Sequence, residues 1–100
     1  MYIVFLKFSE NKASAPQFME SHKNWIKRGL DENVFLLVGS IEPNAGGAIL
    51  AHNASMEEIK IRVEEDPFVK ENIVKAEIIQ ITPAKACENL NFLLENKNKP

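Results

Sequence analysis

Two polar residues that lie far apart in the chain are the strongest candidates for chemistry. His22 lies within the stretch 14–30, and Asp66 opens the tripeptide Asp66-Pro67-Phe68. Histidine titrates near neutral pH and serves as a general acid or base, and a carboxylate beside an imidazole orients it and stabilises its charged form. We therefore expect an acid–base pair of His22 and Asp66. The structural alternative is a histidine that completes the core and an aspartate that merely precedes a helix-stopping proline.

The element that must position His22 is a helix predicted over residues 14–30. Ser14 and Gln17 match a capping box, Pro16 suits the first helical turn, and Gly29 is expected to end the helix. His22 falls in the apolar stripe, where an unsatisfied imidazole costs about 1–3 kcal/mol. The residues at steps of three and four that form this stripe are Phe18, His22, Trp25, Ile26 and Gly29. The charged residues fall mostly on the opposite face: Glu20, Lys23, Lys27 and Arg28.

The order of predicted elements defines the fold class. A second helix begins with the capping box of Ser55 and Glu58 and is stopped by Pro67. The order strand, helix, strand, strand, helix, strand is the ferredoxin-like βαββαβ arrangement, an α+β fold with a four-stranded antiparallel sheet. We expect this domain over 1–83 and a C-terminal extension over 84–100, with a short helix and a frayed polar end. The predicted strands are 2–8, 34–40, 47–52 and 73–82; the helices are 14–30, 56–65 and 84–95; the segment 68–72 is expected to be irregular.

Both faces of the predicted sheet are apolar. Two helices cover one face, so a monomer would expose the other as a large hydrophobic patch. We therefore expect a homodimer through the sheet face, that is, a dimeric α+β barrel. Alternation places Tyr2, Val4, Leu6 and Phe8 opposite Ile3 and Phe5, and Val34, Leu36 and Val38 opposite Phe35 and Leu37.

Composition excludes several classes of partner. The chain has 12 Lys plus Arg against 14 Asp plus Glu, a net charge of -2, and no basic run, so neither nucleic acid nor an anionic membrane is expected. No apolar run is long enough to span a bilayer, and no signal peptide is visible. Cys87 is the only cysteine, which fits a reducing compartment, and we expect the protein in the cytoplasm.

Other residues have weaker claims on a site. Trp25, Ser40 and Phe68 are the predicted substrate-binding residues: Trp25 can stack on a ligand, and Ser40 ends a strand beside a cleft. The alternatives are a core tryptophan and a simple strand-end hydroxyl. His52 is expected to be exposed, and Cys87 to be a small buried hydrophobe. Two histidines and one cysteine without ligand spacing predict no metal site, and no cofactor is expected.

Taken as a set, these motifs resemble the YciI-like (YCII-related) proteins, which are small dimeric α+β barrels. The resemblance covers nearly all of 1–83 and rests on the early strand, the mid-helix His22, Gly39 at the end of the second strand, a glycine-rich start to the third, and Asp66-Pro67-Phe68 before the last. It implies that His22 and Asp66 are the centre of an acid–base site. Many members have Gly-Pro where this chain has Gly39-Ser40, so the lining of the cleft differs here.

The resemblance implies small-molecule chemistry without a cofactor. One relative eliminates chloride from a chlorinated hydroxyquinol, and muconolactone isomerases share the barrel. The first hypothesis is therefore an isomerase or lyase that uses His22 and Asp66 on a small cyclic or aromatic acid or phenol. The alternatives are a non-catalytic binding or accessory dimer, a structural dimerisation module and, with no axial-ligand pattern to support it, a haem or flavin-free oxygenase.

Overall fold

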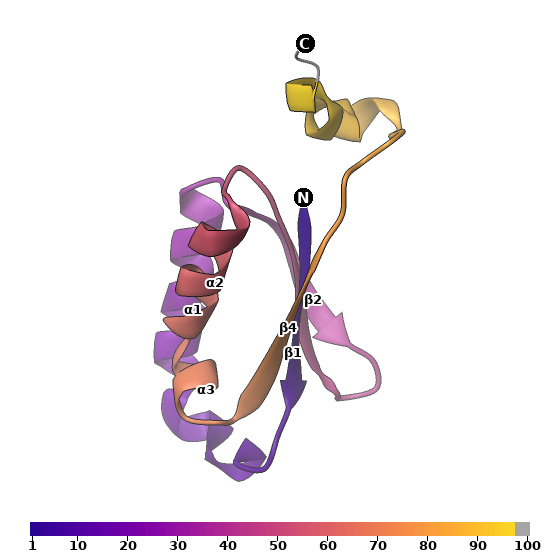
Figure 1. The fold of residues 1–100 in the computed structure, drawn as a ribbon. Coiled ribbons are helices and arrows are strands. Elements are labelled where there is room, and N and C mark those ends of the chain that lie inside the picture. The colour runs from indigo at the N-terminus through magenta and orange to yellow at the C-terminus, as the bar shows by residue number, and fades with distance from the viewer. Residues whose placement is uncertain (98–100) are drawn as a thin grey trace.

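A computed structural model describes residues 1–97 of the chain. It contains four strands, three α-helices and two 3-10 helices in the order that the sequence predicts, with short additions (Figure 1). Predicted and observed boundaries of the four strands agree to within two residues. The strands are β1 (Tyr2–Phe8), β2 (Phe35–Ile41), β3 (Gly46–Ala51) and β4 (Val74–Gln80); the helices are η1 (Lys12–Ser14), α1 (Ala15–Asp31), α2 (Met56–Glu64), α3 (Pro67–Lys70) and η2 (Glu88–Lys97).

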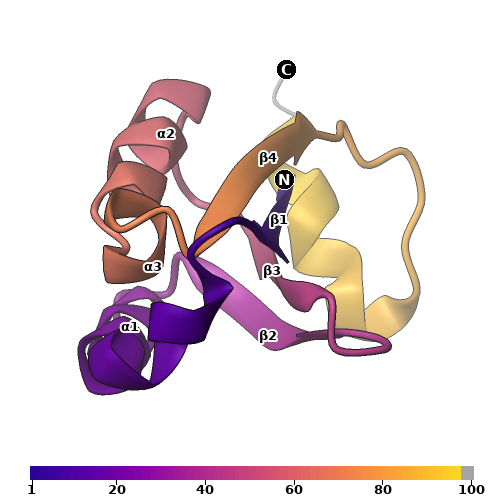
Figure 2. The same cartoon turned by 90° about the horizontal axis from the view of Figure 1, so that it is seen from below.

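The strands form one antiparallel sheet in the order β2-β3-β1-β4. The first strand is central, with Tyr2 opposite Ala51 of β3 on one side and Gln80 of β4 on the other. Helices α1, α2 and α3 lie against one face of this sheet, whereas η2 lies on the opposite side and beyond the strand ends (Figures 1 and 2). The architecture is the predicted ferredoxin-like α+β fold.

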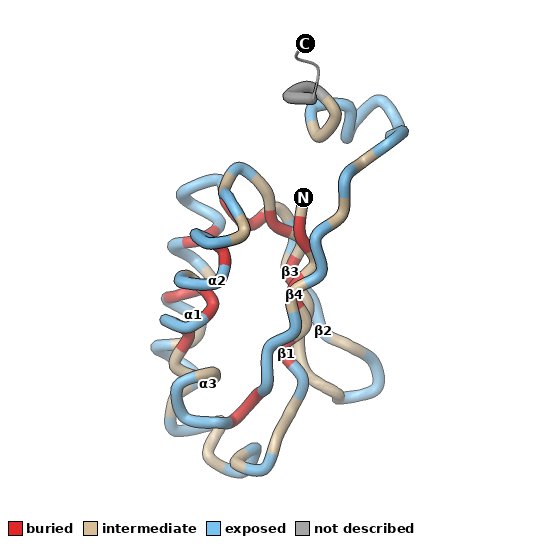
Figure 3. The backbone as a smooth tube through the Cα atoms, in the orientation of Figure 1, coloured by how far each residue is buried: buried red, intermediate tan, exposed pale blue. Residues whose placement is uncertain are grey.

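The core lies between the helices and the sheet (Figure 3). Alternate residues of β1 are buried, because successive side chains of a strand point to opposite faces. Each large apolar side chain removed from water here contributes about 1.5–3 kcal/mol of hydrophobic free energy. The largest fully buried apolar side chains are Trp25, Ile49, Ile59, Ile73 and Val4.

A β-bulge in β2 changes which of its side chains point towards the helices, so the predicted simple alternation does not hold. Phe35 pairs with Ala51 and Leu37 pairs with the next residue, Leu50, so Leu36 is the extra residue. Phe35 is therefore buried and Val38 packs against the core, whereas Leu37 is 64% exposed on the open face. The prediction that Val38 and Leu36 share a face opposite Phe35 is wrong for this reason.

Both ends of α1 differ from the prediction. Ser14 is the N-cap residue, but its hydroxyl donates to Asn11 Oδ1 instead of accepting from the helix, so no capping box forms. Gly29 does not end the helix; it is buried inside it. A Cβ there would lie 2.2 Å from Phe35 Cδ2, so the absence of a side chain lets the Phe35 ring pack against the helix backbone.

The predicted capping box of α2 is present: Glu58 N donates to Ser55 Oγ and Ser55 N donates to Glu58 Oε1. The prediction of an irregular segment over 68–72 is wrong for most of its length. Pro67–Lys70 forms the short helix α3, because Asp66 caps it and Pro67 is compatible with a first helical turn.

The C-terminal extension leaves β4 without regular structure and then forms η2. The helix predicted over 84–95 is thus displaced towards the C-terminus and has 3-10 geometry. Cys87 is exposed, which corrects the expectation that it is buried. The end of the predicted frayed segment, 98–100, lies outside the described residues. No helix within 1–97 has the length and apolar character required to cross a membrane.

Candidate functional site

The structure brings His22 and Asp66 together across 44 residues of sequence. His22 Nδ1 lies 2.7 Å from Asp66 Oδ1, and the carboxylate is completely buried. Asp66 Oδ1 accepts hydrogen bonds and an imidazole nitrogen facing it must carry the proton, so we assign the Nδ1–H tautomer to neutral His22. The other ring nitrogen, Nε2, is then the proton acceptor of the imidazole.

Helix capping fixes the position of this carboxylate. Asp66 is the N-cap of α3, and its Oδ1 also accepts from Phe68 N at 3.0 Å. The sequence places Asp66 at the unfavourable C-terminal end of α2, but its side chain is directed at the next helix, where N–H groups favour an acceptor. One oxygen atom thus holds both the helix start and the imidazole.

The plane of the imidazole is fixed by an aromatic neighbour. The rings of His22 and Phe68 are stacked, with centroids 3.9 Å apart and an interplanar angle of 4°. Trp25 lies farther away, at 5.9 Å, and its indole N–H donates to the Arg62 carbonyl at 3.0 Å. Trp25 is only 1% exposed, so the structure places it in the core and not on a ligand-facing wall, contrary to its predicted role in stacking on a substrate.

His22 lines a cavity of about 370 Å³ between α1 and the sheet. This volume lies in the range of small-molecule sites. Ser40 and Phe68, both predicted to bind substrate, line this cavity as well, and so does Lys23. The apolar residues of the wall include Leu6, Phe8, Met19, Ile26, Val38 and Ile49.

Glycine provides part of the space on the sheet side. Ser40 pairs with Gly47, and Gly47 pairs with the buried Leu6, so these three positions share the helix-facing side of the sheet. Gly47 has no side chain there, and a Cβ would meet only the Gly39 carbonyl, at 3.4 Å. The glycine-rich stretch therefore shapes the cavity wall in addition to forming the hairpin.

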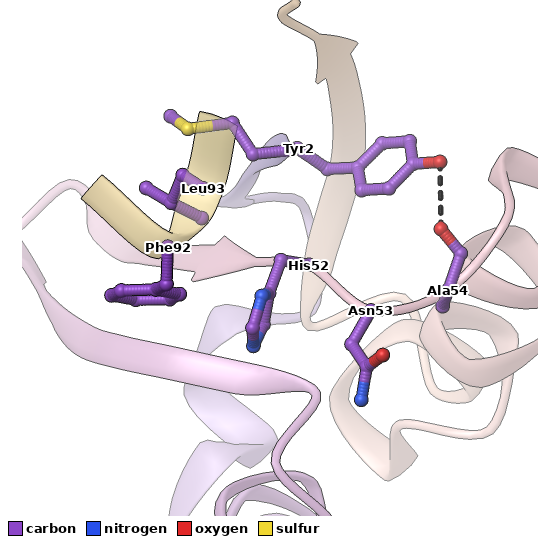
Figure 4. A pocket seen from close by; sticks show the side chains of 7 residues that line it. Tyr2, His52, Asn53, Ala54, Phe92 and Leu93 are labelled. Carbon is purple, nitrogen blue, oxygen red and sulfur yellow. Dashed lines mark hydrogen bonds between the residues drawn. The ribbon is translucent and has the colours of Figure 1, made fainter. Parts of the chain in front are cut away.

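A second, larger cavity of about 730 Å³ lies at the other end of β1, beside His52 (Figure 4). His52 is half-buried, not exposed as predicted, and the edge of its ring meets Phe92 of η2 with centroids 5.6 Å apart. Its buried Nε2 has no hydrogen-bond partner among the described residues. Tyr2, whose hydroxyl donates to the Ala54 carbonyl at 2.8 Å, forms another part of the wall.

Lys23 lines the candidate site, although the sequence did not single it out. Helical periodicity assigns it to the charged face of α1, yet it lines the cavity beside His22. Its adjacency to His22 was the only available signal. Within the described part of the chain, no group of three or more His, Cys, Asp or Glu side chains is arranged to hold a metal ion.

The fold and the site define a class: a ferredoxin-like α+β protein with a small cavity beside a histidine–carboxylate pair. No protein-family model matches the chain, and no curated protein matches it. Among solved structures it is similar to 5-chloro-2-hydroxyhydroquinone dehydrochlorinase (TftG) from Burkholderia phenoliruptrix AC1100, solved in complex with 2,5-dihydroxybenzoquinone. The TM-score is 0.67 with 12% sequence identity, over 84% of this chain and 96% of that one, so the likeness establishes the fold.

Proposed function

We propose that the protein is a small-molecule enzyme of the isomerase or lyase type, in which His22 moves a proton on a small cyclic or aromatic acid or phenol. The observation that carries this proposal is the 2.7 Å contact of His22 Nδ1 with the buried Asp66 carboxylate, at the wall of a cavity. An imidazole held at one nitrogen by a carboxylate is the arrangement of a general base.

In this mechanism Nε2 accepts a proton from a ring hydroxyl or from a carbon next to a carbonyl. The positive charge that develops on the imidazole is stabilised by Asp66, which is buried and therefore poorly screened by water. Returning the proton to another atom of the substrate gives an isomerisation. Departure of an anion with its bonding electrons from the neighbouring carbon gives an elimination. Neither step requires a cofactor.

Two further observations support this class of substrate. The cavity wall is mainly apolar, as a planar ring requires, and Ser40 offers a hydroxyl for orientation. The structural neighbour is a dehydrochlorinase of a hydroxylated ring. We also infer membership of the YciI-like family from the combination of His22, Gly39 and the Asp66-Pro67-Phe68 motif.

Turnover of 5-chloro-2-hydroxyhydroquinone, measured by chloride release, tests the proposal first. We expect activity in the wild type and its loss in His22→Gln, with the melting temperature of the variant kept as a control for folding. The second candidate is a non-catalytic binding or accessory protein, which the mainly apolar cavity also accommodates. Binding that perturbs His22 NMR signals without turnover of this or related phenols would favour it over the enzyme.

We further propose that the protein acts as a homodimer through the open face of its sheet. An apolar row crosses all four strands on this face, formed by Leu37, Leu50, Ile3 and Ile79. A second copy is the occupant that we favour, because an apolar row that spans the whole sheet can pack against its own copy about a twofold axis. Leu37 and Ile79 of this row are exposed, and η2 lies beyond the strand ends (Figure 1).

Sedimentation velocity tests the dimer. Leu37 is 64% exposed on the open face and Ile61 is 55% exposed on α2, so lysine substitutions at the two positions form a matched pair. We expect Leu37→Lys to give monomers and Ile61→Lys to leave dimers. A wild type that sediments as a monomer at micromolar concentration would refute this part of the proposal.

We also propose a cytoplasmic location, because the single cysteine of the chain is exposed and free, which suits a reducing compartment.

A further inference from the structure

We infer that the His22 cavity selects a planar ring that carries a negative charge, and that Lys23 supplies the matching positive charge. The inference rests on the proposed function, because it assumes that this cavity is the ligand site. It adds the charge of the ligand and the residue that recognises it.

The ionisable residues that line the cavity are basic. Among the described residues, three with polar side chains line the cavity, His22, Lys23 and Ser40, and no Asp or Glu is part of this lining. The Asp66 carboxylate lies behind His22, where it is fully buried and engaged with the imidazole. A ligand in the cavity therefore lies among residues that carry an ammonium group, a hydroxyl and an imidazole, which together favour an anion over a cation.

Two lysines one turn apart on α1, Lys23 and Lys27, differ in whether their charge is already paired. Lys27 Nζ lies 2.8 Å from Asp31 Oδ2, and this hydrogen bond and charge raise the pKa of Lys27. Lys27 is thus already paired with an anion. Lys23 has no ion-pair partner within the described part of the chain, so its charge remains uncompensated at the cavity.

The polar residues of the cavity lie on two different walls. Lys23 and His22 belong to α1, whereas Ser40 belongs to β2, so the basic residues line the helix wall of the cavity and the hydroxyl residue lines its sheet wall. The space between them is bounded by apolar side chains and by Gly47. A ring with an anionic group near the helix wall and a hydroxyl group near the sheet wall could pair with Lys23 and hydrogen-bond to Ser40.

The test compares two probes that differ in charge and little in shape, 4-hydroxybenzoate and 4-hydroxybenzamide. Dissociation constants are measured by NMR titration of the full chain, with His22 signals as the reporter of the site. We expect the wild type to prefer the benzoate by about three- to fivefold, as for a partly solvent-screened ion pair, and 1 M salt to reduce this preference.

Three variants assign the preference to Lys23. Lys23→Gln should abolish it, Lys23→Arg should restore it, and Lys27→Gln should retain it, because Lys27 is directed to Asp31. Both positions are exposed on α1, so the three variants are expected to fold, and circular dichroism checks this.

The outcomes separate the inference from the proposed function. Equal affinity for both probes, with His22 signals shifting in each case, would overturn the selection of charge and leave the ligand site intact. A preference that persists in Lys23→Gln would overturn the role of Lys23. Failure of both probes to perturb His22 at millimolar concentration would overturn the inference and also remove the ligand site on which the proposed function depends.

Discussion

The two histidines of this chain lie at opposite ends of β1, and each borders a cavity, but their surroundings differ. His22 has a buried carboxylate 2.7 Å from one nitrogen and a phenyl ring stacked on its plane. His52 meets Phe92 only edge-on, and its buried Nε2 has no partner among the described residues. The cavity beside His52 has about 730 Å³, against about 370 Å³ beside His22. We therefore expect the chemistry at His22 and not at His52, although the cavity beside His22 is the smaller of the two.

The largest expected effect is on turnover. His22→Gln should lower kcat about 10²–10⁴-fold, the range for loss of a positioned general base. His52→Gln should change kcat less than about twofold, because His52 lies outside the proposed site. Steady-state kinetics of both variants on one substrate measure the contrast. A greater loss in His52→Gln would reverse the comparison and place the chemistry at the other end of the sheet.

The next effect is on stability. Asp66→Ala removes the N-cap acceptor of α3 and the partner of His22, and we expect it to lower the free energy of unfolding by about 1–2 kcal/mol. Asp31→Ala removes only an exposed ion pair with Lys27 and should lower the free energy of unfolding much less, because water screens this pair. Urea unfolding monitored by circular dichroism provides both values. Equal losses would mean that Asp66 has no special role in holding α3.

A smaller effect is expected from two adjacent glycines that face opposite sides of the sheet. Gly47→Ala places a methyl group in the His22 cavity, and we expect it to weaken binding of 4-hydroxybenzoate about tenfold, as an added methyl group does in a closely fitting pocket. Gly39→Ala places its methyl on the open face, where no described atom beyond those of its two chain neighbours lies within 4 Å. Binding in this control should remain at the wild-type level; a matching loss would argue that the probe binds elsewhere.

The smallest effect is spectroscopic. Long-range ¹H–¹⁵N correlation spectra distinguish the two tautomers of neutral histidine. We expect His22 to be held in the Nδ1–H form by Asp66 and His52 to show a mixture, because no carboxylate selects its tautomer. Asp66→Asn should change the His22 pattern and leave His52 unchanged. Identical spectra for His22 in the two proteins would mean that the carboxylate does not control the imidazole in solution.

The fold could be predicted from the sequence where local patterns were sufficient. The boundaries of β1 and the capping box of α2 depend on residues that are neighbours in sequence, and both are confirmed. The bulge at Leu36 could not be predicted, because alternation is a rule about one strand and a bulge is a property of its pairing with another. Gly29 was misassigned for a similar reason: the ring that requires a glycine there belongs to Phe35.

The sequence indicated the two residues of the candidate pair but not the geometry that brings them together. The sequence singled out His22 and Asp66 but gave no reason for their contact, which depends on α3 directing the aspartate back towards α1. Periodicity also assigned Lys23 to the solvent side, since a helical wheel divides residues into two faces and ignores a cavity at the boundary between them.

The double use of Asp66 Oδ1, which receives both the Phe68 N–H and His22, has a consequence for how related sequences diverge. A lineage that loses the proposed reaction would still be selected to keep the aspartate, because its carboxylate stabilises the start of α3. The histidine would be free to drift. Retention of the aspartate alone would then record ancestry of the fold, and replacement of the histidine would mark the descendants that have given up proton transfer.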